Sequence, residues 1–272
     1  MKNTLLKKTL ILLTLTAVAP MSLQALESPI KNNVYASDLS EQEHIEKWNK
    51  YNGRNPLGQD YFKKVENTKE YPYQAVGSIF IKQKTVATAS VVGKNKIITN
   101  YHIAKQAEND PSKVIFRPGL TTDENGVFQR PFGEFTAKSI EEAPFGAGLE
   151  LAIITLNPNE EGKEIGEVVK PLELGNANAV EPRQKLSLIG YPNEHVQNKM
   201  FNQEIEVLST KNGLKYFGYT ESGNSGSPIL DGDNSIVGIH VGKSGFDDKR
   251  KFLIGTLFDG NLPKLLKEKL NK

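Results

Sequence analysis

A serine in the stretch 220–228 has the surroundings of a nucleophile. Ser225 lies between Gly223-Asn224 and Gly226, and these small neighbours leave its hydroxyl exposed. They also allow the backbone N–H groups of Gly223 and Ser225 to converge on one point, where an oxyanion forms when a serine attacks a carbonyl carbon. A plain glycine and serine turn between two strands is the alternative interpretation, and four residues alone do not exclude it.

A serine hydroxyl is a weak nucleophile without a general base, and histidine is the usual base near neutral pH. His102 follows an apolar, β-type run, so we expect a strand end to deliver it to a short turn. The third partner of such a site is a carboxylate that holds the imidazole in one tautomer. Glu150, at the head of a buried-looking strand, is the candidate, whereas Glu141 and Glu142 lie in a polar loop and are expected to be solvated.

The chain order His102, Glu150, Ser225 is that of the chymotrypsin-like proteases and differs from the order in subtilisins and α/β-hydrolases. Further motifs accompany these three residues: Thr99-Asn100-x-His102, Leu149-x-Leu151-Ala152-Ile153, Leu188–Pro192, Gly223–Ser227, Val237–His240, Glu46–Tyr51 and Tyr71–Tyr73. From about residue 40 to its end, the chain resembles the staphylococcal exfoliative toxins, a branch of the glutamyl endopeptidases within the chymotrypsin-like serine proteases.

The family that the chain resembles has an aspartate where Glu150 stands. The extra methylene extends the carboxylate by on the order of 1 Å, and catalytic positions tolerate only about half of that. Glutamate does serve as the triad acid in some α/β-hydrolases. Three hypotheses therefore stay open: a glutamate-specific endopeptidase, a protease-shaped binding protein with weak or no activity, and a secreted protease of broad specificity. For the first, the resemblance implies an extracellular cadherin of the desmoglein type as the target.

Three residues around the nucleophile could recognise the substrate. Thr220 ends the strand before the nucleophile turn, and His240 ends the strand after it. A hydroxyl and an imidazole can both hydrogen-bond a carboxylate, and a protonated imidazole adds charge. This matches the family pattern for cleavage after glutamate, and Lys243 fits as a further positive group. For His240 the alternative is a buried histidine satisfied within the core.

Short β-branched runs, separated by Gly, Pro, Asn and Asp, predict an all-β protein. They fall into two groups of about six, which predicts two six-stranded antiparallel β-barrels of the chymotrypsin-like type with the active site in the crevice between them. We assign 37–70 to an N-terminal helical extension, 71–160 to the first barrel and 161–272 to the second. The expected strands are 75–81, 85–92, 96–99, 113–116, one near 135–137, 149–156, 184–190, 205–209, 214–220, 227–230, 236–240 and 252–257.

A helix is predicted near each end of the chain. Residues 38–51 contain Ser40 followed by Glu43, which is a capping box, and we expect Ile45, Trp48 and Tyr51 on its inner face with His44 solvated. Residues 262–272 form an amphipathic pattern, in which the lysines are expected to be solvated. The residues expected to face inward there are Leu262, Leu265, Leu266 and Leu270. His195, in a polar loop, is expected at the surface.

Residues 1–36 have the pattern of a signal peptide, with lysines followed by a short apolar run and a cleavage site after Ala36. Cleavage after Ala25 and a retained membrane anchor are the alternatives. This segment holds four lysines and one acidic residue, so the net charge of +2 falls to −1 without it. We expect a secreted monomer that has no membrane or nucleic-acid partner, and no metal or other cofactor. The chain has no cysteine, so the core alone must hold the fold.

Overall fold

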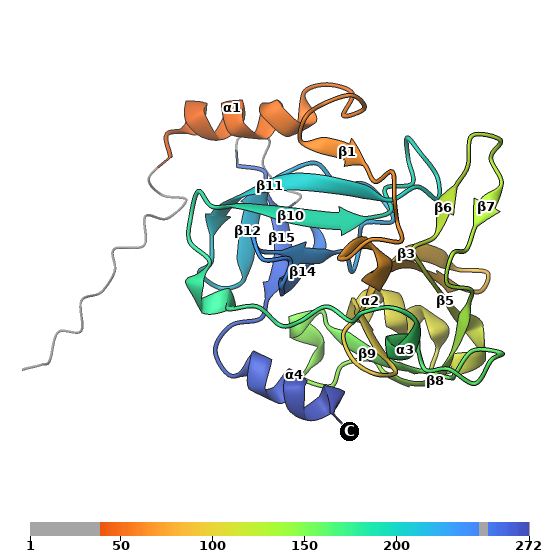
Figure 1. Cartoon of the computed structure of the whole chain (residues 1–272). Helices are drawn as coiled ribbons and strands as arrows, with labels where there is room; N and C mark the ends of the chain where they lie inside the picture. The colour runs from red at the N-terminus through yellow and green to blue at the C-terminus, as the bar shows by residue number, and fades with distance from the viewer. Residues whose placement is uncertain (1–38, 245–249, 272) are drawn as a thin grey trace, which may run out of the picture. The chain divides into compact units, whose positions relative to one another are not determined.

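The computed structural model describes residues 39–244 and 250–271 (Figure 1). All of them belong to one unit, Asn33–Lys272. Strands dominate this unit and form two closed six-stranded antiparallel β-barrels, as the sequence predicts. The predicted signal peptide, residues 1–36, lies outside the described residues.

The first barrel closes in the order β2-β3-β4-β9-β8-β5. β-Branched and aromatic side chains from several strands meet inside it, and Ile79, Ile97 and Phe116 have no exposed surface. Closure pairs every strand on both sides and leaves no free edge. The strands are β2 (Val76–Ile81), β3 (Thr85–Val91), β4 (Lys96–Thr99), β5 (Val114–Pro118), β8 (Phe135–Glu141) and β9 (Ala152–Leu156). A two-stranded hairpin, β6 (Thr121–Thr122) with β7 (Phe128–Gln129), projects from the same half of the chain.

The second barrel follows the order β11-β10-β13-β14-β15-β12, and pairing of β12 with β11 closes it. A seventh strand, β1 (Phe62–Lys64), comes from the N-terminal extension and pairs with β11 outside the ring. This short strand is absent from the sequence prediction. The remaining strands are β10 (Lys185–Gly190), β11 (Phe201–Ser209), β12 (Leu214–Phe217), β13 (Pro228–Leu230), β14 (Ile236–Lys243) and β15 (Leu253–Leu257).

Helix α1 (Glu41–Asn52) begins with the predicted capping box of Ser40 and Glu43 and ends at Gly53. Its inner face differs from the prediction, because His44 is only 6% exposed. The imidazole Nε2 of His44 lies 2.8 Å from the backbone carbonyl oxygen of Lys251, and its ring meets Phe217 edge-on. An aromatic contact and a hydrogen bond to the backbone just before β15 therefore turn this histidine inward.

Helix α4 (Leu262–Leu270) is present as predicted, but only part of its leucine face is buried. Leu262 and Leu266 are buried, whereas Leu265 is 42% exposed, contrary to the prediction. Lys269 pairs with Glu141, so this carboxylate and this lysine are not simply solvated. The short helices are α2 (Tyr101–Ala104), α3 (Ile165–Val168) and the 3-10 turns Tyr73–Ala75, Lys105–Ala107, Pro111–Lys113, Ala147–Leu149 and Ala177–Ala179.

Candidate active site

The turn that carries Ser225, the candidate nucleophile, is called the nucleophile turn here; it is a sharp bend between β12 and β13 that only glycine can form at two positions. Gly223 and Gly226 have φ angles of 99° and 81°, a region that other residues rarely adopt. A Cβ at Gly223 would lie 2.2 Å from the carbonyl oxygen of Tyr191, and one at Gly226 would lie 2.3 Å from that of Thr88. The backbone N–H groups of Gly223 and Ser225 have no hydrogen-bond acceptor among residues 39–244 and 250–271.

Thr88, on β3 of the first barrel, holds this turn of the second barrel. Its N–H donates to the carbonyl of Ser225 at 3.0 Å, and its hydroxyl donates to the carbonyl of Gly223 at 2.8 Å. The same hydroxyl accepts the N–H of Tyr191 at 3.2 Å. Thr88 is fully buried, so water does not compete for these bonds. The two barrels are thereby fixed to each other at the turn that carries Ser225.

His102 lies in α2, directly after β4, and reaches both predicted partners. Its Nδ1 is 2.7 Å from Oε2 of Glu150, and its Nε2 is 3.1 Å from Oγ of Ser225. The backbone N–H of His102 also donates to Oε2 of Glu150, at 3.2 Å. The structure therefore brings the three residues that the sequence singles out into one series of hydrogen bonds, to which both barrels contribute.

The sequence predicts that Glu150 begins a strand, and this is wrong. Glu150 ends the 3-10 turn Ala147–Leu149, and β9 begins two residues later. Its backbone is left-handed, with φ 51° and ψ 33°, a conformation that is uncommon outside glycine, asparagine and aspartate. The amide of Asn100 donates to the carbonyl of Glu150 at 3.0 Å, and the hydroxyl of Thr256 donates to that of Leu149. This turn aims the longer carboxylate at His102.

The candidate specificity residues lie beside the nucleophile turn. His240 exchanges backbone bonds with it: its N–H donates to Ser227 at 2.9 Å and its carbonyl accepts from Gly226 at 3.0 Å. Strand β12 ends at Phe217 and β14 runs on to Lys243, so neither Thr220 nor His240 is at a strand end, contrary to the prediction.

Thr220 and His240 are both buried, and their polar atoms are used differently. The Oγ1 of Thr220 has no hydrogen-bond partner within the described residues. The Nδ1 of His240 lies 2.6 Å from the hydroxyl of the buried Tyr216. Burial lowers the pKa of His240 to about 3, and the positive charges of Lys243 and His102 add to this. His240 is therefore neutral at physiological pH, which corrects the idea of a protonated imidazole.

The family model described as Trypsin matches residues 62–259. The chain belongs to this family of serine proteases.

Relatives of this protease include exfoliative toxin A of Staphylococcus aureus, 39% identical over 97% of this chain and 98% of the toxin. The glutamyl endopeptidase of S. aureus strain MW2 is 32% identical over 65% of this chain, and the match spans 54% of that relative. Among solved structures, a Glu endopeptidase in complex with MPD has a TM-score of 0.63 at 19% identity and covers 79% of this chain and 99% of its own. Protease Anisep of Arthrobacter nicotinovorans has a TM-score of 0.57 at 15% identity, covering 75% and 99% respectively. At these identities the two structures show a common fold.

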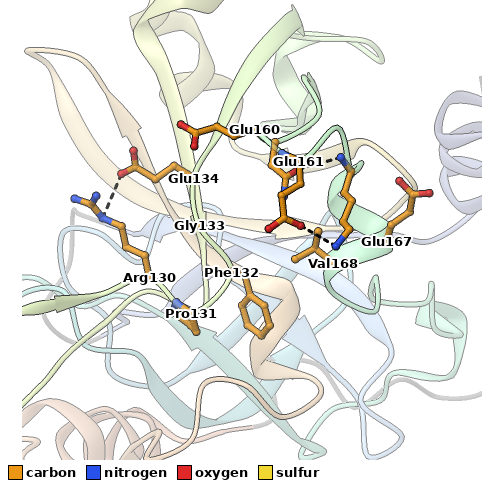
Figure 2. A pocket seen from close by; sticks show the side chains of 11 residues that line it. Arg130, Pro131, Phe132, Gly133, Glu134, Glu160, Glu161, Glu167 and Val168 are labelled. Carbon is orange, nitrogen blue, oxygen red and sulfur yellow. Dashed lines mark hydrogen bonds and ion pairs between the residues drawn. The ribbon is translucent and has the colours of Figure 1, made fainter.

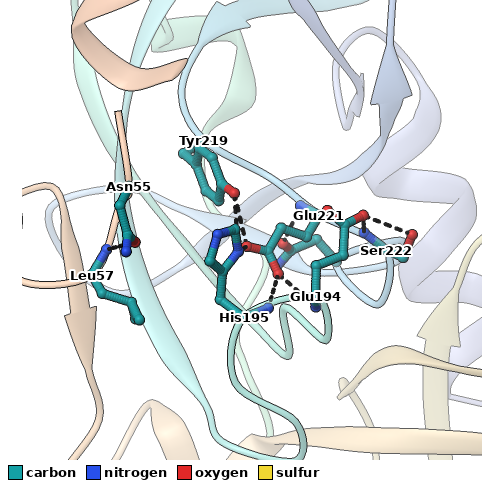
Figure 3. A network of polar contacts seen from close by, with 8 residues as sticks. Asn55, Leu57, Glu194, His195, Tyr219, Glu221 and Ser222 are labelled. Carbon is teal, nitrogen blue, oxygen red and sulfur yellow. Dashed lines mark hydrogen bonds and ion pairs between the residues drawn. The ribbon is translucent and has the colours of Figure 1, made fainter. Parts of the chain in front are cut away.

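Glu221, which the sequence leaves without a role, is buried in the protease at the start of the nucleophile turn. Its carboxylate accepts from the backbone N–H of Glu194 at 2.7 Å and from the hydroxyl of Tyr219 at 2.8 Å, and it pairs with the ring of His195 (Figure 3). His195 is at the surface as predicted, but it is also part of this network. The sequence gives no signal for it because the partners lie 26 and 27 residues apart.

The protease also has a surface pocket of about 680 Å³, formed by segments 130–134 and 159–168 (Figure 2). Acidic side chains rim it, and two of them are already paired, Glu134 with Arg130 and Glu161 with Lys163. His102, Glu150 and Ser225 are not among the residues that line this pocket. Within 39–244 and 250–271, no group of three or more metal-binding side chains gathers, and no helix is long and apolar enough to cross a membrane.

Proposed function

We propose that this serine protease is a secreted, monomeric endopeptidase that cleaves after glutamate, with Ser225 as nucleophile, His102 as general base and Glu150 as the orienting acid. The observation that carries the proposal is the unbroken series of contacts from Glu150 Oε2 to His102 Nδ1, at 2.7 Å, and from His102 Nε2 to Ser225 Oγ, at 3.1 Å. Both distances are those of hydrogen bonds, and the imidazole lies between the acid and the hydroxyl, as general-base catalysis requires.

In the proposed reaction, Nδ1–H of His102 donates to Glu150, which leaves Nε2 free to accept the proton of Ser225. The alkoxide oxygen attacks the scissile carbonyl carbon, and the N–H groups of Gly223 and Ser225 stabilise the oxyanion. His102 then gives its proton to the leaving amine, and water hydrolyses the acyl-enzyme by the same route. Glu150 stabilises the imidazolium and stays ionised throughout.

Two observations support the choice of glutamate. The buried Oγ1 of Thr220 has no protein partner in the described part of the chain, so a polar group of the substrate would satisfy it. His240 is neutral, so it donates from Nε2 only when Nδ1 is the unprotonated nitrogen and accepts a hydrogen bond from another group. The hydroxyl of Tyr216, at 2.6 Å from Nδ1, is that donor. A hydroxyl and an N–H then face the substrate carboxylate, and Lys243 supplies the positive charge.

The proposed target class rests on the family resemblance. Exfoliative toxin A is a relative whose match spans 97% of this chain, and the exfoliative toxins that the motifs resemble imply an extracellular cadherin of the desmoglein type. Cleavage of such a cadherin breaks adhesion between epidermal cells. Secretion by way of the 1–36 segment is part of this proposal.

The non-catalytic binding protein is the second candidate, and Glu150 is the specific feature that favours it. The geometry counts against it, because Oε2 of Glu150 is within hydrogen-bond distance of both the ring and the backbone N–H of His102. An acid too long for its site would miss one of the two. The protease of broad specificity is disfavoured by the buried polar pair of Thr220 and His240, which an apolar substrate side chain would leave unsatisfied.

A series of peptide amides that differ only in the residue before the scissile bond tests the proposal. We expect hydrolysis after Glu to exceed that after Gln, Leu and Arg by at least about 100-fold in kcat/KM, since a site built for a polar group rejects substrates that lack it. Ser225→Ala is the control and is expected to have no measurable activity. Hydrolysis by that variant, or comparable rates after Leu and Glu, would overturn the mechanism or the specificity respectively.

A further inference from the structure

Glu221 is a buried carboxylate whose side chain is 1% exposed and pairs with the ring of His195. Four donors surround it: the backbone N–H groups of Glu194 and His195 reach Oε2, and the hydroxyl of Tyr219 and the ring of His195 reach Oε1. Burial, and then the hydrogen bond to Glu221, raise the pKa of Tyr219, so this hydroxyl stays a donor. So many donors on one buried carboxylate indicate a fixed anchor and not a solvated surface charge.

The anchor joins the loop 193–195 to the nucleophile turn. The N–H of Asn193 donates to the carbonyl of Ser222 at 2.9 Å, and Oε1 of Glu194 accepts from both the N–H and the hydroxyl of Ser222, at 3.3 and 3.1 Å. Figure 3 shows Glu194 and Glu221 reaching past each other between the two segments. Every donor and acceptor here belongs either to the loop or to the segment that runs into Gly223.

The bond from Asn193 to Ser222 sets the direction of an oxyanion donor. In a trans peptide, the carbonyl and the N–H point to opposite sides. Because the carbonyl of Ser222 points at Asn193, the N–H of Gly223 points away from the loop. We propose that Glu221 is a positioning residue for the oxyanion site: by holding the loop 193–195 in place, it fixes the orientation of the Ser222–Gly223 peptide.

The other end of Glu221 is fixed as well. Its N–H donates to Oδ1 of the buried Asn224 at 3.0 Å, and its carbonyl accepts the N–H of Asn224 at 3.1 Å. Asn224 directly precedes the nucleophile, so the backbone of Glu221 and that of Ser225 belong to one small bonded unit. The Lys243 ammonium lies 5.8 Å from the ring centre of Tyr219, so it adds a positive group beside the network.

This inference rests on the proposed function, because it assigns Glu221 to the oxyanion site of the same reaction. Loss of one oxyanion donor lowers kcat by about 10²–10³, and partial misorientation lowers it by less. For Glu221→Ala we expect kcat to fall about 10–100-fold while KM changes less than about threefold. For Glu221→Gln, which fills the same volume but cannot accept from all four donors, we expect a fall of about threefold or more.

The experiment compares the full chain, these two variants and Glu108→Gln. Glu108 pairs with Lys113 and Lys84 at the surface of the first barrel, so this control removes a paired charge far along the chain from the turn. Three quantities are measured: kcat on a glutamyl peptide amide, the affinity for a peptide boronic acid with a glutamate-like side chain, and the affinity for the product peptide ending in Glu. The boronate needs the oxyanion donors, whereas the product peptide needs mainly the side-chain pocket.

We expect Glu221→Ala to lose boronate affinity by about the same factor as kcat and to keep product affinity within about threefold, with Glu108→Gln like the wild type. Wild-type kcat and boronate affinity in either folded variant would overturn the proposal. If Glu221→Ala fails to fold, Glu221→Gln decides on the same criterion. A wild-type protein that does not cleave after Glu overturns the proposed function instead, before the variants are compared.

Discussion

Shortening the side chain of Glu150, the proposed orienting acid, is the change for which the structure makes the clearest prediction. The family resemblance alone favours Glu150→Asp as a gain of activity, because aspartate is the family's residue. The structure predicts the opposite. Oε2 of Glu150 already lies 2.7 Å from Nδ1 of His102 and 3.2 Å from its backbone N–H, from a backbone that the turn fixes in a left-handed conformation.

The magnitude follows from this geometry. Removing a methylene withdraws the carboxylate by on the order of 1 Å, which lengthens the contact with Nδ1 beyond the usual hydrogen-bond limit of about 3.2 Å. Complete loss of the orienting acid lowers turnover by about 10⁴. A carboxylate that is displaced but still charged retains part of the effect. We therefore expect Glu150→Asp to lower kcat about 10–100-fold and Glu150→Gln about 10³–10⁴-fold.

Folding and chemistry can be separated in this test. Aspartate is tolerated better than glutamate at a positive φ, so Glu150→Asp should unfold at the same denaturant concentration as the wild type or a higher one. The assay is initial-rate hydrolysis of a glutamyl peptide amide at saturating substrate, beside urea unfolding of each variant. Activity of Glu150→Asp equal to or above the wild type would refute the reasoning and would mean that Glu150 holds His102 poorly.

Three further perturbations have expected outcomes. Thr88→Val leaves the carbonyl of Gly223 and the N–H of Tyr191 unpaired in the interior, so the free energy of unfolding should fall by roughly 2–4 kcal/mol. Urea unfolding measures this change, and a decrease below about 0.5 kcal/mol would contradict the claim that Thr88 holds the two barrels together. Tyr216→Phe removes the donor to Nδ1 of His240, so the KM for glutamyl peptides should rise about tenfold, while the KM for glutaminyl peptides should change little. If the ratio of these two KM values stays as in the wild type, the Tyr216 hydroxyl does not set the tautomer of His240. Since the pKa of His240 is lowered from 6.5 to about 3, the unfolded chain binds the extra proton between these values. Stability should therefore decline as pH falls from about 6.5 toward 3, by up to about 1.4 kcal/mol per pH unit, and the slope should be shallower in His240→Gln; equal slopes in the two proteins would contradict the buried neutral state.

Much of the fold could be predicted because β-branched runs and their breaks are local signals. The strand predicted at 85–92 is observed at Thr85–Val91, and the one at 96–99 is observed unchanged. Strand β1 could not be predicted in this way: three residues carry no period, and only its partner β11 makes them a strand. The burial of His44 and the exposure of Leu265 differ from the prediction for a related reason. The elements packed against a helix decide which residues at the edge of its apolar face are covered.

The candidate site was predictable in composition but not in shape. The candidate nucleophile, base and acid have chemical signatures in the sequence, and the structure brings all three together. The left-handed turn that aims Glu150 has no such signature, since glutamate is not a residue that favours a positive φ. The network around Glu221 joins loops that are far apart in sequence, and the neutral state of His240 depends on how deeply it is buried. Both are properties of the assembled barrels.

The most direct test of the central claim is digestion of a purified desmoglein ectodomain by this protein, with Ser225→Ala beside it and the cut site read by N-terminal sequencing of the fragments. A folded substrate is the better choice, because contacts remote from the cut can contribute to assembly of the site. We predict cleavage at a single bond that follows glutamate, and no cleavage by the variant. An intact ectodomain, or fragments that also form with Ser225→Ala, would contradict the account.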